Sequence, residues 1–523
     1  VSTAGIAALT SDQVVSLTTG QVAAVTTTQL QALTDAEVGA LTTSQVQALQ
    51  GTQVAALTTG SVTALSSDQV AAFTTSQVPS ITTTQVGVLK ADQVSALTTD
   101  QVTQLTTTQL AVLANSNVAA LSTAQVDALS TSQLTSLNTS QVQALTAAVV
   151  ASLSTDKVQA LTTTQVKALS ADQMGALTTT EASNLTTTQV KVLGADQIRA
   201  LTTASVAALT TGQVQALTTT QVSGLISSTV ASFTTDQVQA LTTSQVKVLS
   251  AQAAAAFSTS AVAALSSSQL QQMTKEAIQA LDTNQVKALS TSAIAGLSTA
   301  QLATLSSAEV ALLSTSQLKQ LSTDQVKALN ADGVAGLSTA QVAALSTTQV
   351  SSLTSDQVSV MTAEQVASLT KAGVAVLRTD AVAALTVAQA KAFTTAQVAA
   401  LTTAQIQQLN TSQISALSAT QVGALETADL RKFSADQLQA ISTGALKSLT
   451  SAQLTSLTAE QVATLKTSQV KALSNSQLQA LTTAQVAAMS TEQVAALTTA
   501  QIASIESADL VSIKAEALAS LST

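Results

Sequence analysis

The side chains in this sequence that could do chemistry are few and offer mainly oxygen atoms. The chain of 523 residues has no His and no Cys, which removes the usual zinc, haem and thiol chemistry. Its acidic residues are scattered, as in Thr98-Thr99-Asp100-Gln101. A calcium ion needs six or more oxygen ligands, and single carboxylates near helix starts are explained by the helix dipole. We therefore expect no enzyme: no catalytic residue, no cofactor-binding residue, no cofactor and no metal site.

Hydroxyl groups are the second chemical feature of the chain. Clusters such as Thr82-Thr83-Thr84 and Thr106-Thr107-Thr108 recur along the whole sequence. A regular array of Thr hydroxyls could order water, so an ice- or surface-binding protein is one alternative function. We favour a role in capping helices, because the second position of these clusters also accepts Ala91, Ala171 and Ala195.

The elements that position these side chains follow an eight-residue repeat. The segments LTTSQVQAL (41–49), LTTGSVTAL (57–65) and LTTTQVKAL (161–169) share one frame. With Leu41 in slot 1, every eighth residue from Val1 to Leu521 is Leu, Val, Ile, Phe or Met, without insertion or deletion. Slot 2 is nearly always Thr or Ser, slot 5 is usually Gln, and slot 8 is usually Ala. Slot 6 is Val, Ile, Leu or Met except at Ala182, Ala254 and Ala390.

The period of eight argues against strands and against one long helix. A strand has period 2 and would place slot 6 and the next slot 1 on opposite faces. In a continuous helix eight residues overshoot two turns by about 80°, so the apolar stripe would circle the helix. One short helix per repeat gives every slot a role.

In that interpretation the repeat at 161–168 is a helix capped at its start. Thr162 is the N-cap and Gln165 the third helical residue, which is the spacing of a capping box. Leu161 before the cap and Val166 inside the helix form a hydrophobic staple. Asp282, Asn330 and Asn410 keep the capping chemistry in slot 2. We predict a helix of about two turns, followed by a sharp corner.

A two-turn helix is unstable alone, so the repeats must stack on one another. The predicted fold class is all-α: a continuous solenoid of very short helices, one per eight-residue repeat. We predict one uninterrupted array over residues 1–523, about 65 repeats, that is part of a longer array. The number of helices per solenoid turn stays open.

Composition also limits the partners. A net charge of −9, with basic residues scattered, argues against nucleic-acid binding. A Ser/Thr cluster interrupts nearly every eight residues, so no span of about 18 apolar residues can cross a membrane. We expect no small-molecule substrate, and self-association end to end or side by side.

Ala, Thr, Gln and Val repeats without Cys, in a chain with 9% charged residues, resemble arrays in large repetitive proteins of Gram-negative bacteria. Those proteins are secreted or adhesin-like surface proteins. The resemblance, which covers the chain through its LTTxQVxAL unit, implies an extracellular stalk, filament or coat. We therefore expect a structural protein, extracellular or at the cell surface, that forms a rod, filament, coat element or spacer.

Overall fold

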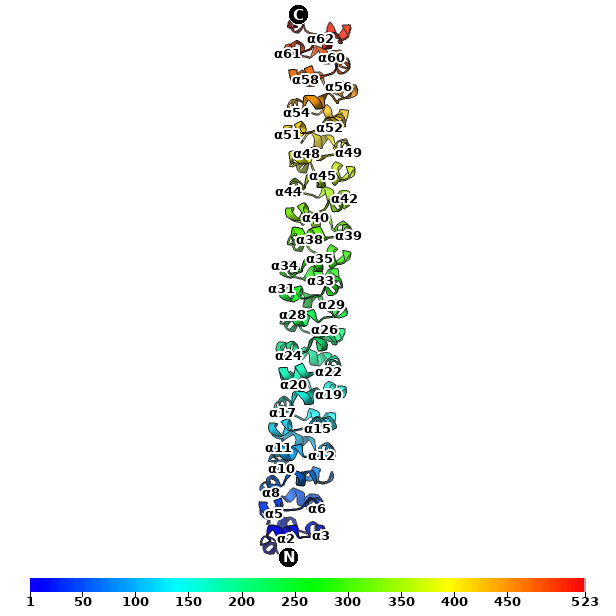
Figure 1. Ribbon diagram of the computed structural model, residues 1–523. Coiled ribbons are helices and arrows are strands. Elements are labelled where there is room, and N and C mark those ends of the chain that lie inside the picture. Colours follow the sequence, from blue (N-terminus) through cyan, green and yellow to red (C-terminus); the bar gives the residue numbers. More distant parts are fainter. Residues whose placement is uncertain (522–523) are drawn as a thin grey trace. The chain divides into compact units, whose positions relative to one another are not determined.

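The fold is helical throughout the part of the chain that the structure describes. The computed structural model describes residues 1–521, which contain 64 α-helices, one 3-10 helix and no β-strand (Figure 1). The all-α prediction and the prediction of one short helix per repeat are confirmed. The strand interpretation is excluded for these residues.

Helix boundaries follow the slots of the repeat. Every α-helix begins at slot 3: α1 to α9 at every eighth residue from Thr3 to Ser67, and α10 to α64 at every eighth residue from Thr83 to Ala515. The helices have four to six residues, which is between one and two turns. Four-residue helices are α1, α4, α18, α37, α49, α50, α53, α55, α62 and α63. Six-residue helices are α6, α7, α8, α12, α15, α17, α19, α20, α21, α22, α23, α24, α26, α29, α33, α35, α38, α39, α40, α42, α45, α48, α54, α56 and α58, and the others have five.

The corners between helices are built from ordinary extended backbone. After α6 (Thr43–Ala48), Leu49 has φ −60° and ψ 138°, and Gln50 has φ −77° and ψ 155°. No residue in the described range 1–521 has a positive φ. The corner therefore needs no glycine, which explains why Leu and Thr can occupy slots 1 and 2 in almost every repeat.

The one proline changes a single helix and leaves its repeat in place. Pro79 lies in slot 7, where its missing N–H would have bonded to the carbonyl of Thr75 in an α-helix. The repeat instead forms a turn and the 3-10 helix η1 (Val78–Ser80). Gln77 still accepts a hydrogen bond from the backbone N–H of Thr74 at 2.7 Å, so the capping contact does not depend on a regular α-helix.

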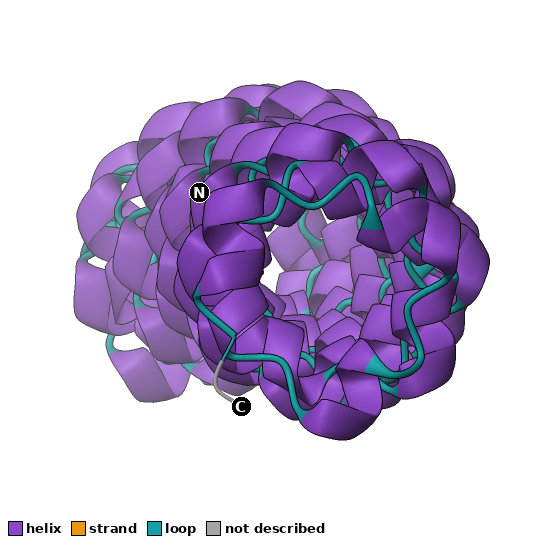
Figure 2. Ribbon diagram, turned by 90° about the horizontal axis from the view of Figure 1, so that it is seen from above, coloured by secondary structure: helices purple, strands orange, loops and turns teal. Residues whose placement is uncertain are grey.

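The chain divides into two compact units, one of residues 1–261 and one from Val262 onward. Within each unit a helix packs on the third helix after it. In the first unit α3 (Thr19–Ala23) packs on α6, and in the second α45 (Ala363–Ser368) packs on α48 (Val387–Ala392). In each unit helices and short loops thus coil around a common axis as a solenoid (Figure 2).

The core consists of the slot 1 and slot 6 side chains. From Leu33 to Leu497 every residue in these two slots is buried, including Ala182, Ala254 and Ala390 and all five phenylalanines. Around Phe73 in the first unit, the interior leaves a cavity of ≈ 10 Å³, about the space of one water molecule. The interior there is a packed core and has no room for a small-molecule ligand.

Replacing Val166 by Asp is expected to open the solenoid around α20 (Thr163–Ala168). Val166 is fully buried, and an uncompensated charge in such a place costs about 3–5 kcal/mol. Limited proteolysis of the full chain should then give new cleavage near residues 161–169. Val166→Ala is the matched control and should stay resistant, because Ala182 already occupies slot 6 with no exposure. An Asp variant as resistant as the wild type would contradict the proposed core.

Candidate functional site

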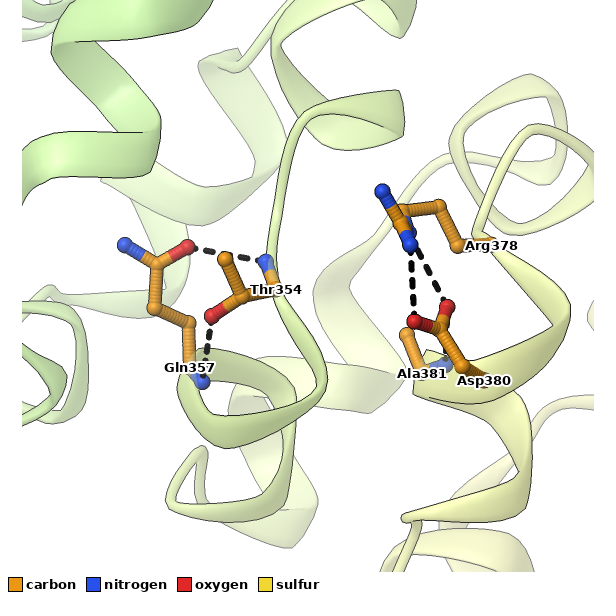
Figure 3. Close-up of polar contacts among 5 residues, drawn as sticks. All are labelled: Thr354, Gln357, Arg378, Asp380 and Ala381. Carbon is orange, nitrogen blue, oxygen red and sulfur yellow. Dashed lines mark hydrogen bonds and ion pairs between the residues drawn. The ribbon is translucent and has the colours of Figure 1, made fainter.

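Most of the described repeats carry the predicted capping box, as α2 (Ser11–Val15) and α20 do. In α20 the Thr162 N–H donates to Gln165 Oε1 at 2.9 Å, and the Gln165 N–H donates to Thr162 Oγ1 at 3.2 Å. Figure 3 shows the same reciprocal pair formed by Thr354 and Gln357, at 3.0 and 3.2 Å. The box satisfies backbone N–H groups that the start of a helix otherwise leaves without partners.

The amide nitrogen of the same glutamine reaches a different helix. Gln165 Nε2 donates to the carbonyl oxygens of Leu134 at 3.0 Å and Leu137 at 2.9 Å. These oxygens lie at the C-terminal end of α16 (Thr131–Thr135) and in the corner after it. We call this contact, from a slot 5 side chain to carbonyls 28 to 31 residues earlier, the inter-turn clasp. One side chain thus caps the start of its own helix and the end of another.

The clasp sets the number of repeats per turn. Gln45 Nε2 donates to Val14 O at 2.8 Å, Val15 O at 3.1 Å and Leu17 O at 2.8 Å, which are 31, 30 and 28 residues earlier. A separation of 28 residues equals three and a half repeats of eight. The separations of 30 and 31 residues are almost four repeats, and helices pack on the third helix after them, so each solenoid turn contains between three and four helices, a number that the sequence leaves open.

The glutamine side chain that forms the clasp is buried, and both its amide oxygen and its amide nitrogen are hydrogen-bonded. Gln165 is 2% exposed, and both its oxygen and its nitrogen have partners. A protein hydrogen bond contributes about 0.5–1.5 kcal/mol net, and leaving a buried carbonyl without a donor costs more than that. Since the clasp recurs along both units, it stabilises the stacking of turns as well as the ends of individual helices.

Three other residues in slot 5 keep a donor in the same place: Asn117, Lys157 and Ser205. Asn117 Nδ2 donates to Leu89 O at 2.7 Å, and Ser205 Oγ donates to Leu177 O at 2.9 Å. Lys157 donates from Nζ to the backbone carbonyl of Asp127, with its ammonium 2.8 Å from the carboxylate of the same residue. Slot 5 side chains of several lengths thus point at carbonyl oxygens of the preceding turn.

Three repeats carry Glu in slot 5: Glu37, Glu181 and Glu309. Glu181 Oε2 accepts from the Thr178 N–H at 2.7 Å, so the capping half of the contact is kept. An ionised carboxylate cannot donate to the preceding turn. Burial raises the pKa of Glu181, against the opposing effect of its hydrogen bonds with Thr178.

One repeat replaces the capping box with an ion pair. Arg378 stands in slot 2 and Ala381 in slot 5, so neither half of the box is available. Asp380 instead accepts from the Ala381 N–H at 3.0 Å and from Arg378 Nε and Nη2 at 2.9 and 2.8 Å (Figure 3). The Arg378 guanidinium lowers the pKa of Asp380, and the carboxylate raises the pKa of Arg378. Both side chains are about half exposed, so the pair contributes little to stability.

Sequence reasoning places the capping and staple residues correctly and misses the clasp. Thr162 and Gln165 form their box, and Leu161 and Val166 are buried. The missed signal is the choice of Gln over Glu in slot 5, because a capping box accepts either residue. A preference for the amide indicates that a donor is required as well as an acceptor.

Among residues 1–521 no helix has the length and apolar character of a membrane span.

Replacing Glu181 by Gln is expected to stabilise α22 (Thr179–Asn184) at neutral pH by about 1–3 kcal/mol, because the amide can complete the clasp. The folded pKa of Glu181 is raised, so its stabilising contribution is complete below the unfolded pKa and is lost as the pH rises through the folded one. The difference between variant and wild type should therefore grow from pH 3 to pH 7. Hydrogen-exchange protection factors of residues 178–185 measure it.

The control for this experiment is Glu364→Gln. Glu364 is exposed and its pKa is lowered, first by a hydrogen bond to its own backbone. The Glu364 carboxylate stabilises the folded chain above its unfolded pKa, and this stabilisation is lost as the pH falls. Removing its charge should therefore give no gain in stability at neutral pH. Equal protection of residues 178–185 in wild type and Glu181→Gln at pH 7 would show that the amide donor is unimportant.

Comparison with known proteins identifies the repeat. The ALTTAQ repeat matches residues 1–27, 110–147, 118–155, 150–179, 196–227, 278–315, 310–339, 334–371, 392–427, 422–459 and 470–504. No curated protein matches the chain. Among solved structures, a homology model of the full-length AP-3 complex in an intermediate open conformation aligns with 88% of this chain and 77% of its own at 11% identity. Its TM-score of 0.15 gives no support for a shared fold. Since the repeat matches cover more than half of the residues, the chain belongs to the ALTTAQ repeat family.

Proposed function

We propose that this chain is a structural protein: a rod, filament or coat element that serves as a stalk or spacer, without catalytic activity of its own. The observation that carries the proposal is the inter-turn clasp, which uses the same slots in repeat after repeat. A solenoid held by one repeated contact has a nearly constant rise and twist per repeat. Its length is then set by the number of repeats, which is the property a spacer requires.

The place of action follows from the resemblance of the repeat to arrays in large surface proteins of Gram-negative bacteria. On that basis we propose an extracellular or cell-surface location. Slots 2 and 3, which are exposed or half-exposed, are rich in Ser and Thr and carry few charges, as at Thr162 and Thr163. Such a surface is compatible with side-by-side or end-to-end association of copies, and we propose self-association in place of a distinct ligand.

The test is particle length as a function of repeat number. Inserting a second copy of residues 121–248, which are 16 repeats, should lengthen particles in electron micrographs by about a quarter, since the chain has about 65 repeats. The helical circular dichroism per residue should stay the same. Assembly into longer filaments at higher concentration would support the filament or coat form, and rods of fixed length would support a stalk.

The matched control inserts the same segment together with four extra residues. A shift of half a repeat puts apolar slot 1 residues where slot 5 residues must donate, so the clasps at the junction cannot form. We expect lower thermal stability and cleavage at that junction only. Particles whose length is unchanged by the 16-repeat insertion would contradict the spacer function. Thermal hysteresis of the wild-type chain would instead favour an ice-binding protein that uses its Thr and Ser hydroxyls.

A further inference from the structure

The inter-turn clasp is built around a group of converging backbone oxygens. The three carbonyls of Val14, Val15 and Leu17 all lie within 2.8–3.1 Å of the single atom Gln45 Nε2. They belong to the end of α2 (Ser11–Val15) and the corner after it, where the helix dipole is negative. The place that the amide nitrogen occupies is therefore surrounded by oxygen atoms and favours positive charge.

One repeat of this chain already puts a cation there. Lys157 in slot 5 is 8% exposed, and its ammonium group bonds to the carbonyl oxygen and the carboxylate of Asp127. A buried ammonium group is stable only when oxygen atoms replace its water shell. The site thus accepts a positive charge when a carboxylate accompanies the carbonyls.

At Asp429 the sequence supplies a carboxylate to the same kind of site without a cation. Asp429 lies in slot 5 of α53 (Thr427–Leu430) and is 2% exposed. Its Oδ1 accepts from Thr403 Oγ1 at 2.7 Å, whereas no donor of the described residues reaches its buried Oδ2. The residues 28 and 31 positions earlier, which a slot 5 Gln would contact, are Leu401 and Val398. An ionised Asp cannot donate to their carbonyls.

A second carboxylate accompanies the first. Glu426 is the N-cap of the same helix, and its side chain makes no capping hydrogen bond. Burial raises the pKa of Asp429, and the charge of Glu426 adds to that rise, while the Thr403 hydrogen bond opposes it. Two carboxylates therefore lie close enough to interact electrostatically, and Oδ2 of the buried one has no donor among the described residues.

The same pair of substitutions occurs a second time. Residues 425–430 read LETADL, and residues 505–510 read IESADL. In α63 (Ser507–Leu510) Glu506 is again an N-cap without a capping bond, and Asp509 is 7% exposed in slot 5. The residues 28 and 31 positions earlier are Leu481 and Leu478. No other repeat has Glu in slot 2, so the two changes accompany each other.

We propose that each Glu-x-x-Asp pair, Glu426 with Asp429 and Glu506 with Asp509, binds one calcium ion between neighbouring turns. The carboxylates supply charge, backbone carbonyls of the preceding turn supply further oxygen ligands, and water completes the six to eight that calcium takes. Calcium suits this donor set because carboxylate, carbonyl and water are its preferred ligands and it accepts irregular geometry. Within residues 1–521 no three His, Cys, Asp or Glu side chains come together, so such a site depends on the carbonyls. The ion takes the place of the glutamine amide as the link between turns.

The test is calorimetric titration of the full chain with calcium chloride after removal of bound metal with a chelator. We expect two sites per chain, and calcium should slow hydrogen exchange at residues 426–433 and 506–513. The double variant Asp429→Gln/Asp509→Gln restores the usual residue of slot 5, so it should fold. It should lose both sites, with at least a tenfold loss of calcium affinity. The matched control Asp356→Asn/Asp436→Asn removes two exposed slot 4 charges and should keep both sites.

Three outcomes would overturn the proposal. The first is no calcium binding to the wild-type chain. The second is equal binding by the slot 5 variant and the control. The third is that residues 426–433 are protected equally by sodium chloride at the same ionic strength, or only by a fall in pH. That result would assign the link to a monovalent ion or to a proton. The single variant Asp429→Gln should retain one site, which separates the two locations.

Discussion

The structure depends on a primary amide in the fifth position of an eight-residue repeat. Its oxygen accepts from the backbone at the start of one helix, and its nitrogen donates to carbonyls at the end of another, as Gln45 does across 28 to 31 residues. Both ends of a short helix leave backbone groups without partners. The described residues 1–521 form 64 such helices, so this cost recurs at every repeat, and a glutamine side chain offsets much of it at both helix ends.

Burial of apolar side chains is the second source of stability, after the hydrogen bonds of the amide. Helices of four to six residues do not persist alone in water, so their stability comes from the neighbours on which they pack. Slots 1 and 6 supply the apolar contacts, and slot 5 fixes the register between turns. The repeat at Pro79 illustrates the division of roles: its α-helix is lost, yet Gln77 still donates to the carbonyls of Val46 and Gln47 and Val78 stays buried. The contacts between turns therefore matter more than perfect helix geometry.

The fold class, the helix starts and the buried slots could be predicted from sequence, because capping and staple residues are local signals within one repeat. The clasp and the number of helices per turn could not, since they depend on the backbone angles of the corner residues, such as Leu49 and Gln50. The oxygen atoms around Asp429 escape sequence reasoning for the same reason. Its carboxylate is visible in the sequence as one of a pair three residues apart, whereas the Thr403 hydroxyl that donates to it lies 26 residues earlier and meets it only in the folded solenoid.

The clasp also has a direction: slot 5 amides donate to residues that precede them in the chain, as Gln53 does to Val22 and Gln397 to Leu369. During synthesis the acceptors of each new turn therefore leave the ribosome before its donors. A nascent chain can add one helix at a time to the helices already folded, because the clasps of the described residues span 28 to 31 residues. Such a chain has no need to wait for its C-terminus, and its folding time should grow no faster than its translation time.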